Sequence, residues 1–116
     1  SPIGANALKF FTEYGFSLEM NYDPDAPISI MGQVKNRDMR VNVINHNDAL
    51  ELSQTIIHET AHIQFGWTGT MENEVNCMIY EYLHTHKSIS DQMISKMVSF
   101  VRENYSDLPE GNLYGY

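Results

Sequence analysis

Hydrophobic positions recur with two different periods along this chain. Residues 5–14 carry apolar side chains spaced as on one face of a helix, and the run ends at Gly15, which predicts a short N-terminal helix. Residues 16–20 alternate apolar and polar side chains, which predicts a strand.

The next part of the chain predicts a β-hairpin. Residues 23–27 include two prolines, so we expect a loop there. Residues 28–34 and 39–44 are β-branched and apolar, and the polar residues 35–38 between them are typical of a hairpin tip. We expect 39–44 to form the edge of the sheet beside a cleft, where a peptide could add a strand.

From Asp48 onward the apolar spacing is helical. Asp48 followed by Glu51 fits a capping box, and Gly66 is placed to end this helix. Its predicted buried face consists of Leu52, Ile56, Ile57, Ala61 and Phe65.

Two more helices follow in the pattern. One is predicted over residues 71–86, and another begins where Ser88 and Asp91 fit a capping box. The tail, about residues 106–116, contains proline and glycine and is expected to be irregular. The order predicts an α+β domain over 1–116: a helix, a small antiparallel sheet and three helices.

One motif carries clear chemistry. His58, Glu59 and His62 form an H-E-x-x-H pattern inside a predicted helix. Residues four apart lie on one helical face, so both imidazoles can reach one zinc ion, Zn²⁺, while the glutamate reaches a metal-bound water. Zinc would activate that water, and Glu59 would act as the general base and proton carrier.

A catalytic zinc needs a third protein ligand. The metzincin pattern is excluded, because no histidine follows His62 before His84. Glu72 and Glu74, at the start of the next predicted helix, are the candidates. Helical phase favours Glu72, because Val75 and Ile79 continue its face inward, but Glu74 remains an alternative.

Several other polar residues near the motif are weighed differently. Asn76, one turn after Glu72, could hydrogen-bond a ligating histidine. We interpret Cys77 as a small buried residue and not as a ligand. Tyr80 and Tyr82 are expected in the core, although either could donate a hydrogen bond to an oxyanion.

Composition narrows the class of partner. The formal net charge is −8, from 7 Lys+Arg and 15 Asp+Glu, which argues against nucleic-acid binding. The sequence shows neither a signal peptide nor an apolar run long enough to cross a membrane. We therefore predict a cytoplasmic protein that acts on a peptide or protein substrate, without nucleic acid or membrane partners.

The order of these features resembles the ImmA/IrrE family of small gluzincin-type metallopeptidases. In that family a strand ends in an Ile-Asn pair, as in Ile44-Asn45, and the HExxH motif and an E-x-x-A-N/D element follow, as in residues 72–76. The resemblance implies a minimal zincin fold with Glu72 as third ligand and Asn76 in the N/D place. Residues 69–72 are also similar to the G-T-x-D element of aspzincins, with Glu72 in the ligand place.

The sequence therefore predicts a zinc metallopeptidase that hydrolyses peptide bonds. One alternative is a metallopeptidase toxin domain excised from a larger effector. Another is a zinc-binding sensor or interaction module with little hydrolytic activity. A purely structural zinc domain is a further alternative, in which metal removal would unfold the chain.

Overall fold

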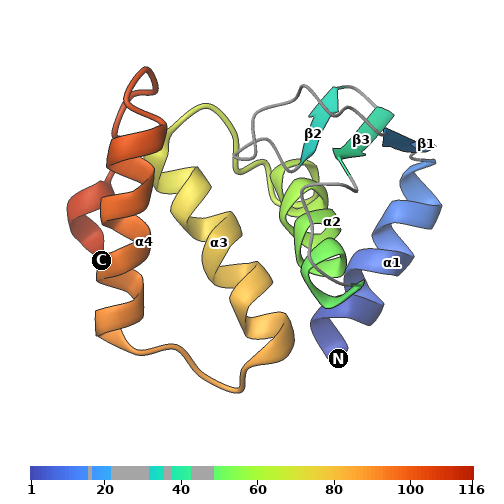
Figure 1. Cartoon of the computed structure of the whole chain (residues 1–116), viewed down its shortest axis with the longest axis horizontal. Helices are drawn as coiled ribbons and strands as arrows, with labels where there is room; N and C mark the ends of the chain where they lie inside the picture. The colour runs from blue at the N-terminus through green and yellow to red at the C-terminus, as the bar shows by residue number, and fades with distance from the viewer. Residues whose placement is uncertain (16, 22–31, 36–37, 43–48) are drawn as a thin grey trace.

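The computed structural model describes residues 1–15, 17–21, 32–35, 38–42 and 49–116. This part of the chain is mainly helical, with a small sheet (Figure 1). None of its helices has the length and apolar character to cross a membrane. Its elements are α1 (Pro2–Tyr14), β1 (Ser17–Asn21), β2 (Gly32–Lys35), β3 (Asp38–Asn42), α2 (Ala49–Gln64), α3 (Met71–Thr85), α4 (Asp91–Asn104) and a 3-10 turn (Leu113–Gly115).

Local capping explains where the helices begin. The Thr70 side chain accepts a hydrogen bond from the backbone N–H of Asn73 and caps α3. The Ser90 side chain does the same for Met93 at the start of α4. The predicted cap at Ser88 is wrong, because the backbone turns into the helix two residues later. The four predicted helices themselves are confirmed.

The predicted antiparallel pair is confirmed, but the third strand joins the sheet differently from the prediction. Its strand order is β1-β3-β2, with β2 antiparallel to β3 and β1 parallel to β3. The sheet is therefore mixed, because β1 pairs with the free side of β3 and does not extend the hairpin from β2. Strand β3 is central and not the expected edge strand, so both its sides are already paired. Residues 22–31 and 43–48, including the predicted loop and the capping residue Asp48, lie outside the described residues.

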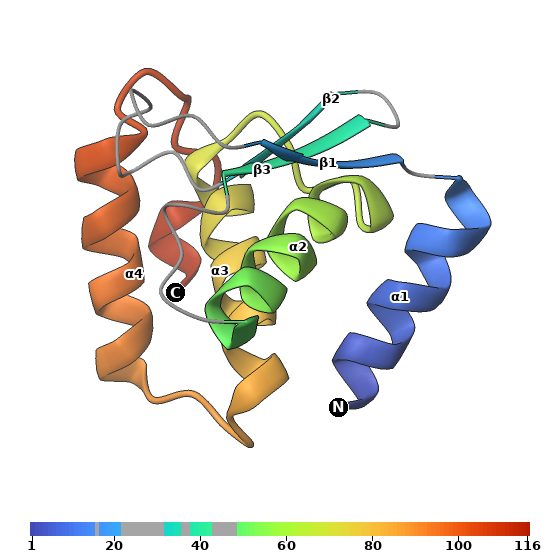
Figure 2. The same ribbon diagram turned by 45° about the vertical axis from the view of Figure 1, so that its right-hand side comes forward.

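The helices stand in the order α1, α2, α3, α4 across the molecule, with the sheet over one end of α2 (Figures 1 and 2). Helix α2 contacts α1, α3, β2 and β3, so it is the most enclosed helix. Helix α3 packs against α2 on one side and α4 on the other. The motif helix is thus held in the interior between its two neighbouring helices and the sheet.

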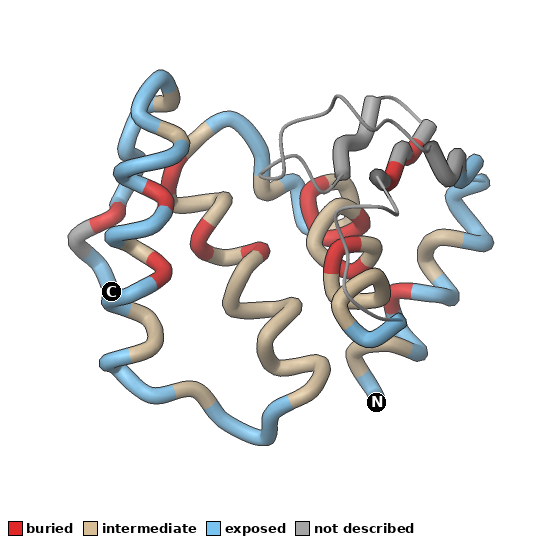
Figure 3. The backbone as a smooth tube through the Cα atoms, in the orientation of Figure 1, coloured by how far each residue is buried: buried red, intermediate tan, exposed pale blue. Residues whose placement is uncertain are grey.

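The main described apolar cluster lies between α3, α4 and the tail. Figure 3 shows buried residues on facing sides of α3 and α4 and along α2. The buried members of this cluster are Met71, Val75, Met97, Val101 and Leu113. On α2, Ile57 and Ala61 are buried as predicted, and Leu52 and Ile56 are partly buried. Phe65, just beyond the end of the helix, is 39% exposed and not buried as expected.

Replacing Val101 with alanine should lower the free energy of unfolding by about 2–3 kcal/mol, because it removes apolar volume from a fully buried position. Urea denaturation followed by circular dichroism measures this loss. The matched control is Val98→Ala on the same helix, where the side chain is only partly buried. Equal losses for both variants would contradict the described core.

Candidate metal centre

The two histidines of the motif lie on one face of α2, which faces α3. Their imidazole rings have centroids 4.9 Å apart and meet edge to face. The side chains are 12% exposed for His58 and 10% exposed for His62. Two polar rings this deep in the protein require partners for their nitrogen atoms.

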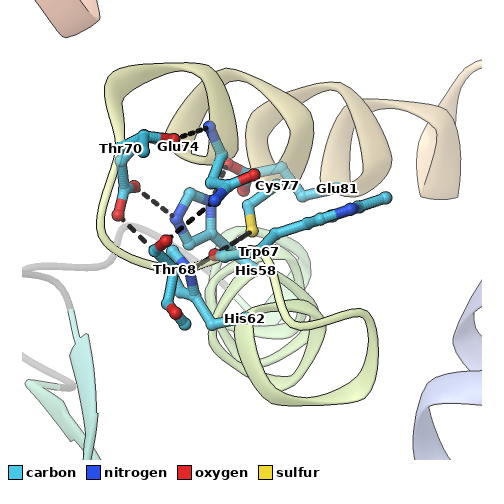
Figure 4. A network of polar contacts seen from close by, with 9 residues as sticks. His58, His62, Trp67, Thr68, Thr70, Glu74, Cys77 and Glu81 are labelled. Atoms are coloured by element: carbon cyan, nitrogen blue, oxygen red, sulfur yellow. Dashed lines mark hydrogen bonds and ion pairs between the residues drawn. The ribbon is translucent and has the colours of Figure 1, made fainter. Parts of the chain in front are cut away.

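Glu74 of α3 supplies a partner to both rings. Its Oε2 atom lies 3.2 Å from His58 Nε2, and its Oε1 atom lies 3.2 Å from His62 Nε2. Figure 4 shows this carboxylate against the imidazoles, across the interface between the two helices. The two Nε2 atoms therefore converge on one carboxylate, which is 13% exposed.

The opposite nitrogen of each ring is also held. His58 Nδ1 lies 3.0 Å from Glu81 Oε1, and His62 Nδ1 lies 2.5 Å from the backbone oxygen of Trp67. A carbonyl oxygen only accepts hydrogen bonds, so Nδ1 of His62 donates and its Nε2 is left for another role. Metal-ligating histidines have this arrangement, with one nitrogen fixed by a carboxylate or carbonyl and the other directed at the ion.

The residues preferred from helical phase lie elsewhere. The Glu72 carboxylate accepts a hydrogen bond from the backbone N–H of Asn112 at 3.0 Å. The Asn76 side chain accepts one from the Tyr116 hydroxyl. Within the described part of the chain, neither forms a hydrogen bond with the histidines, and Glu74, the alternative candidate, lies where Glu72 was expected.

The reason is the way α3 is shared between two neighbours. Its apolar face, which includes Val75 and Ile79, packs toward α4 and not toward α2. Glu74 and Glu81 lie on a different face, two turns apart, and this face meets the histidines. The predicted helical phase is correct, but the prediction assigned the apolar face to the wrong neighbour.

Cys77 also belongs to this face of α3, and it is buried, as the sequence predicted. Its Sγ atom lies 3.5 Å from His62 Nδ1, and one donor atom from each of His58, His62 and Cys77 falls within 4.8 Å of the others. Burial raises the pKa of the thiol, and the carboxylates of Glu74 and Glu59 add to the effect. The sulfur contacts Nδ1 of His62, the nitrogen already bonded to the Trp67 carbonyl.

The site carries strong local charge. Burial by itself would lower the pKa of His58, but hydrogen bonds to Glu74 and Glu81 and the charges of Glu81 and Glu59 outweigh it. The result is a pKa of about 10. His58 is therefore a cation at neutral pH, compensated by the carboxylates around it.

Glu59 lies beside the histidines but is engaged differently. Burial raises the pKa of its carboxyl group, electrostatic interaction with His58 and His62 opposes that shift, and Glu74 and Glu81 reinforce it. A raised pKa is typical of carboxyl groups that transfer protons in catalysis.

Tyr82 packs against the apolar core, as expected, and Tyr80 is partly buried. Tyr80 packs against Phe65 and Trp67, and Tyr82 stacks on His86, so neither is directed at the two motif histidines. Tyr105 lies at the end of α4. Burial raises the pKa of its hydroxyl to about 12, and the charges of Glu74, Glu59 and Glu81 contribute to the shift. Nothing in the helical pattern indicated this.

Comparison of the chain with protein-family models, curated proteins and solved structures found no match. Its function is therefore to be inferred from the chemistry of its own side chains.

Proposed function

We propose that this protein is a zinc-dependent metallopeptidase in which His58, His62 and Glu74 hold the metal and Glu59 is the general base. The observation that carries the proposal is the convergence of two imidazole Nε2 atoms on one carboxylate. The Nδ1 atoms of the same rings are hydrogen-bonded to Glu81 and to the Trp67 carbonyl. Two histidines and one carboxylate are a catalytic donor set for zinc that leaves a position open.

The residues have separable tasks in this proposal. A zinc ion held there would polarise a peptide carbonyl and lower the pKa of a water molecule toward neutrality. Glu59 would take a proton from the attacking water and deliver it to the leaving amine. Glu81 and the Trp67 carbonyl orient the two rings.

The fold is consistent with the same proposal. A small sheet lies over one end of the motif helix (Figure 1) and the next helix supplies the carboxylate, and this order supports the proposal of a minimal zincin within an α+β class. The substrate class, peptides or proteins, rests on the general base and on the sequence resemblance. A sensor module would keep the metal without hydrolysis, and a toxin domain would cleave one cellular target.

Glu59→Gln should abolish peptide cleavage by at least about 100-fold while leaving zinc binding intact, because the amide cannot accept the proton. Zinc-loaded protein incubated with a peptide library, read by mass spectrometry, measures cleavage, and metal analysis measures occupancy. Glu13→Gln, exposed on α1, is the matched control. If wild type and Glu59→Gln are equally inert on all peptides while both hold zinc, the module interpretation replaces the peptidase.

Glu74→Gln should weaken zinc binding far more than Glu72→Gln, which alters the carboxylate that contacts Asn112 instead. Competition with a metal indicator gives the affinities, and cobalt substitution reports the donor atoms. Cys77→Ser tests the alternative donor set of His58, His62 and Cys77. An intense sulfur-to-cobalt absorption band that disappears in this variant would show that Cys77, and not Glu74, is the ligand.

Zinc affinity should rise with pH. Metal binding at Nε2 must displace the proton that His58 retains up to a pKa of about 10, so the affinity should increase about tenfold per pH unit below that value for one proton released. Calorimetry in buffers of different ionisation enthalpy counts the protons. An affinity independent of pH, with no proton released, would show that the metal does not bind at His58.

A further inference from the structure

The residues after α4 fold back over the start of α3. We call residues 109–116 the tail segment. The backbone N–H of Met71 donates to the oxygen of Pro109 at 2.8 Å, and that of Glu72 donates to the oxygen of Glu110 at 3.1 Å. The first turn of a helix has N–H groups without partners inside the helix. Here the tail segment supplies the acceptors for two of them.

Glu72 fastens the tail segment through both its side chain and its backbone. Its Oε2 atom accepts from the backbone N–H of Asn112 at 3.0 Å. Its backbone oxygen accepts from the Tyr116 hydroxyl at 3.3 Å, and the same hydroxyl contacts Asn76. Three backbone or side-chain groups of one residue thus bind the tail segment.

The contact is also closely fitted. Leu113 is 2% exposed and belongs to the core between α3 and α4. Gly111 has a φ of +66°, and a Cβ atom at this position would lie 3.1 Å from the Cβ of Glu72 and 3.3 Å from that of Thr70. Only glycine satisfies both the backbone conformation and the available space.

Glu74 lies in the same first turn, two residues after Glu72, and its carboxylate meets the two histidines. A displacement of this turn by a fraction of an ångström would move that carboxylate relative to His58 and His62. Metal sites are sensitive to such displacements, because ligand geometry depends on the residues that hold the ligands.

We propose that the tail segment is a positioning clamp for the metal centre: by binding the first turn of α3, it sets where Glu74 meets the histidines. Glu72 is the residue through which the clamp acts and is not itself a ligand. This inference rests on the proposed metal centre. It makes zinc affinity depend on residues that never touch the ion.

The test uses Gly111→Ala and Tyr116→Phe, with Gly15→Ala as the matched control. Gly15 also has a positive φ, +78°, but a Cβ atom added there would have no other atom within 4 Å, and the residue ends α1, far from α3 in sequence. Both alanine variants carry the same kind of backbone strain. Zinc affinity of the full chain is measured by indicator competition, and the thermal midpoint reports stability separately.

We expect Gly111→Ala and Tyr116→Phe to weaken zinc binding about tenfold, the lower end of the effect of residues that support metal ligands. Gly15→Ala should retain the wild-type affinity even where its thermal midpoint falls. Tyr116→Phe keeps the aromatic ring, so it remains informative if Gly111→Ala fails to fold. Wild-type zinc affinity in both tail variants would overturn the clamp and leave the metal centre standing.

A double-mutant cycle tests whether the clamp acts through Glu74. In a Glu74→Gln background, Tyr116→Phe should cause no further loss of zinc affinity, because the group being positioned is already gone. A loss of the same size in both backgrounds would overturn the proposed route. Failure of the wild-type chain to bind zinc at all would overturn the proposed metal centre, and the clamp with it.

Discussion

The Glu74 carboxylate, placed between two buried imidazoles, is the interaction on which the interface of α2 and α3 depends. Buried charges are costly unless each one has a partner. Here the cation on His58 is balanced by Glu74 and Glu81, and the second ring is oriented by a backbone carbonyl. The groups that compensate one another in this way also present donor atoms of the kind that zinc prefers.

This arrangement depends on α3 having two faces of different character, one apolar and one polar. One face carries Val75 and joins the apolar core with α4. The other carries Glu74, Cys77 and Glu81 and meets α2. Helix α3 contacts two neighbouring helices. Its apolar face packs against α4, and its polar face meets α2 and forms the candidate metal centre. Stability and chemistry are therefore assigned to separate sides of one helix.

Glu72 binds the tail segment, a role that the sequence motif did not suggest. Its carboxylate and backbone hold residues 109–116, and the first turn of α3 is thereby completed by a distant part of the chain. The buried Leu113 joins the same core as α4. The tail has little regular structure, as predicted, but it is closely bound to the rest of the protein. It contacts the turn of α3 that carries Glu74.

The sequence by itself determined the helices and the H-E-x-x-H face, because apolar spacing, capping residues and the four-residue interval of His58 and His62 are local properties. It also narrowed the candidates for the third metal ligand to Glu72 and Glu74. Only the tertiary structure decided which of the two meets the histidines, and it also brought in Glu81 and the Trp67 carbonyl and placed β3 at the centre of the sheet. Helical phase defines which residues share a face, but which neighbour covers that face depends on packing across the whole chain.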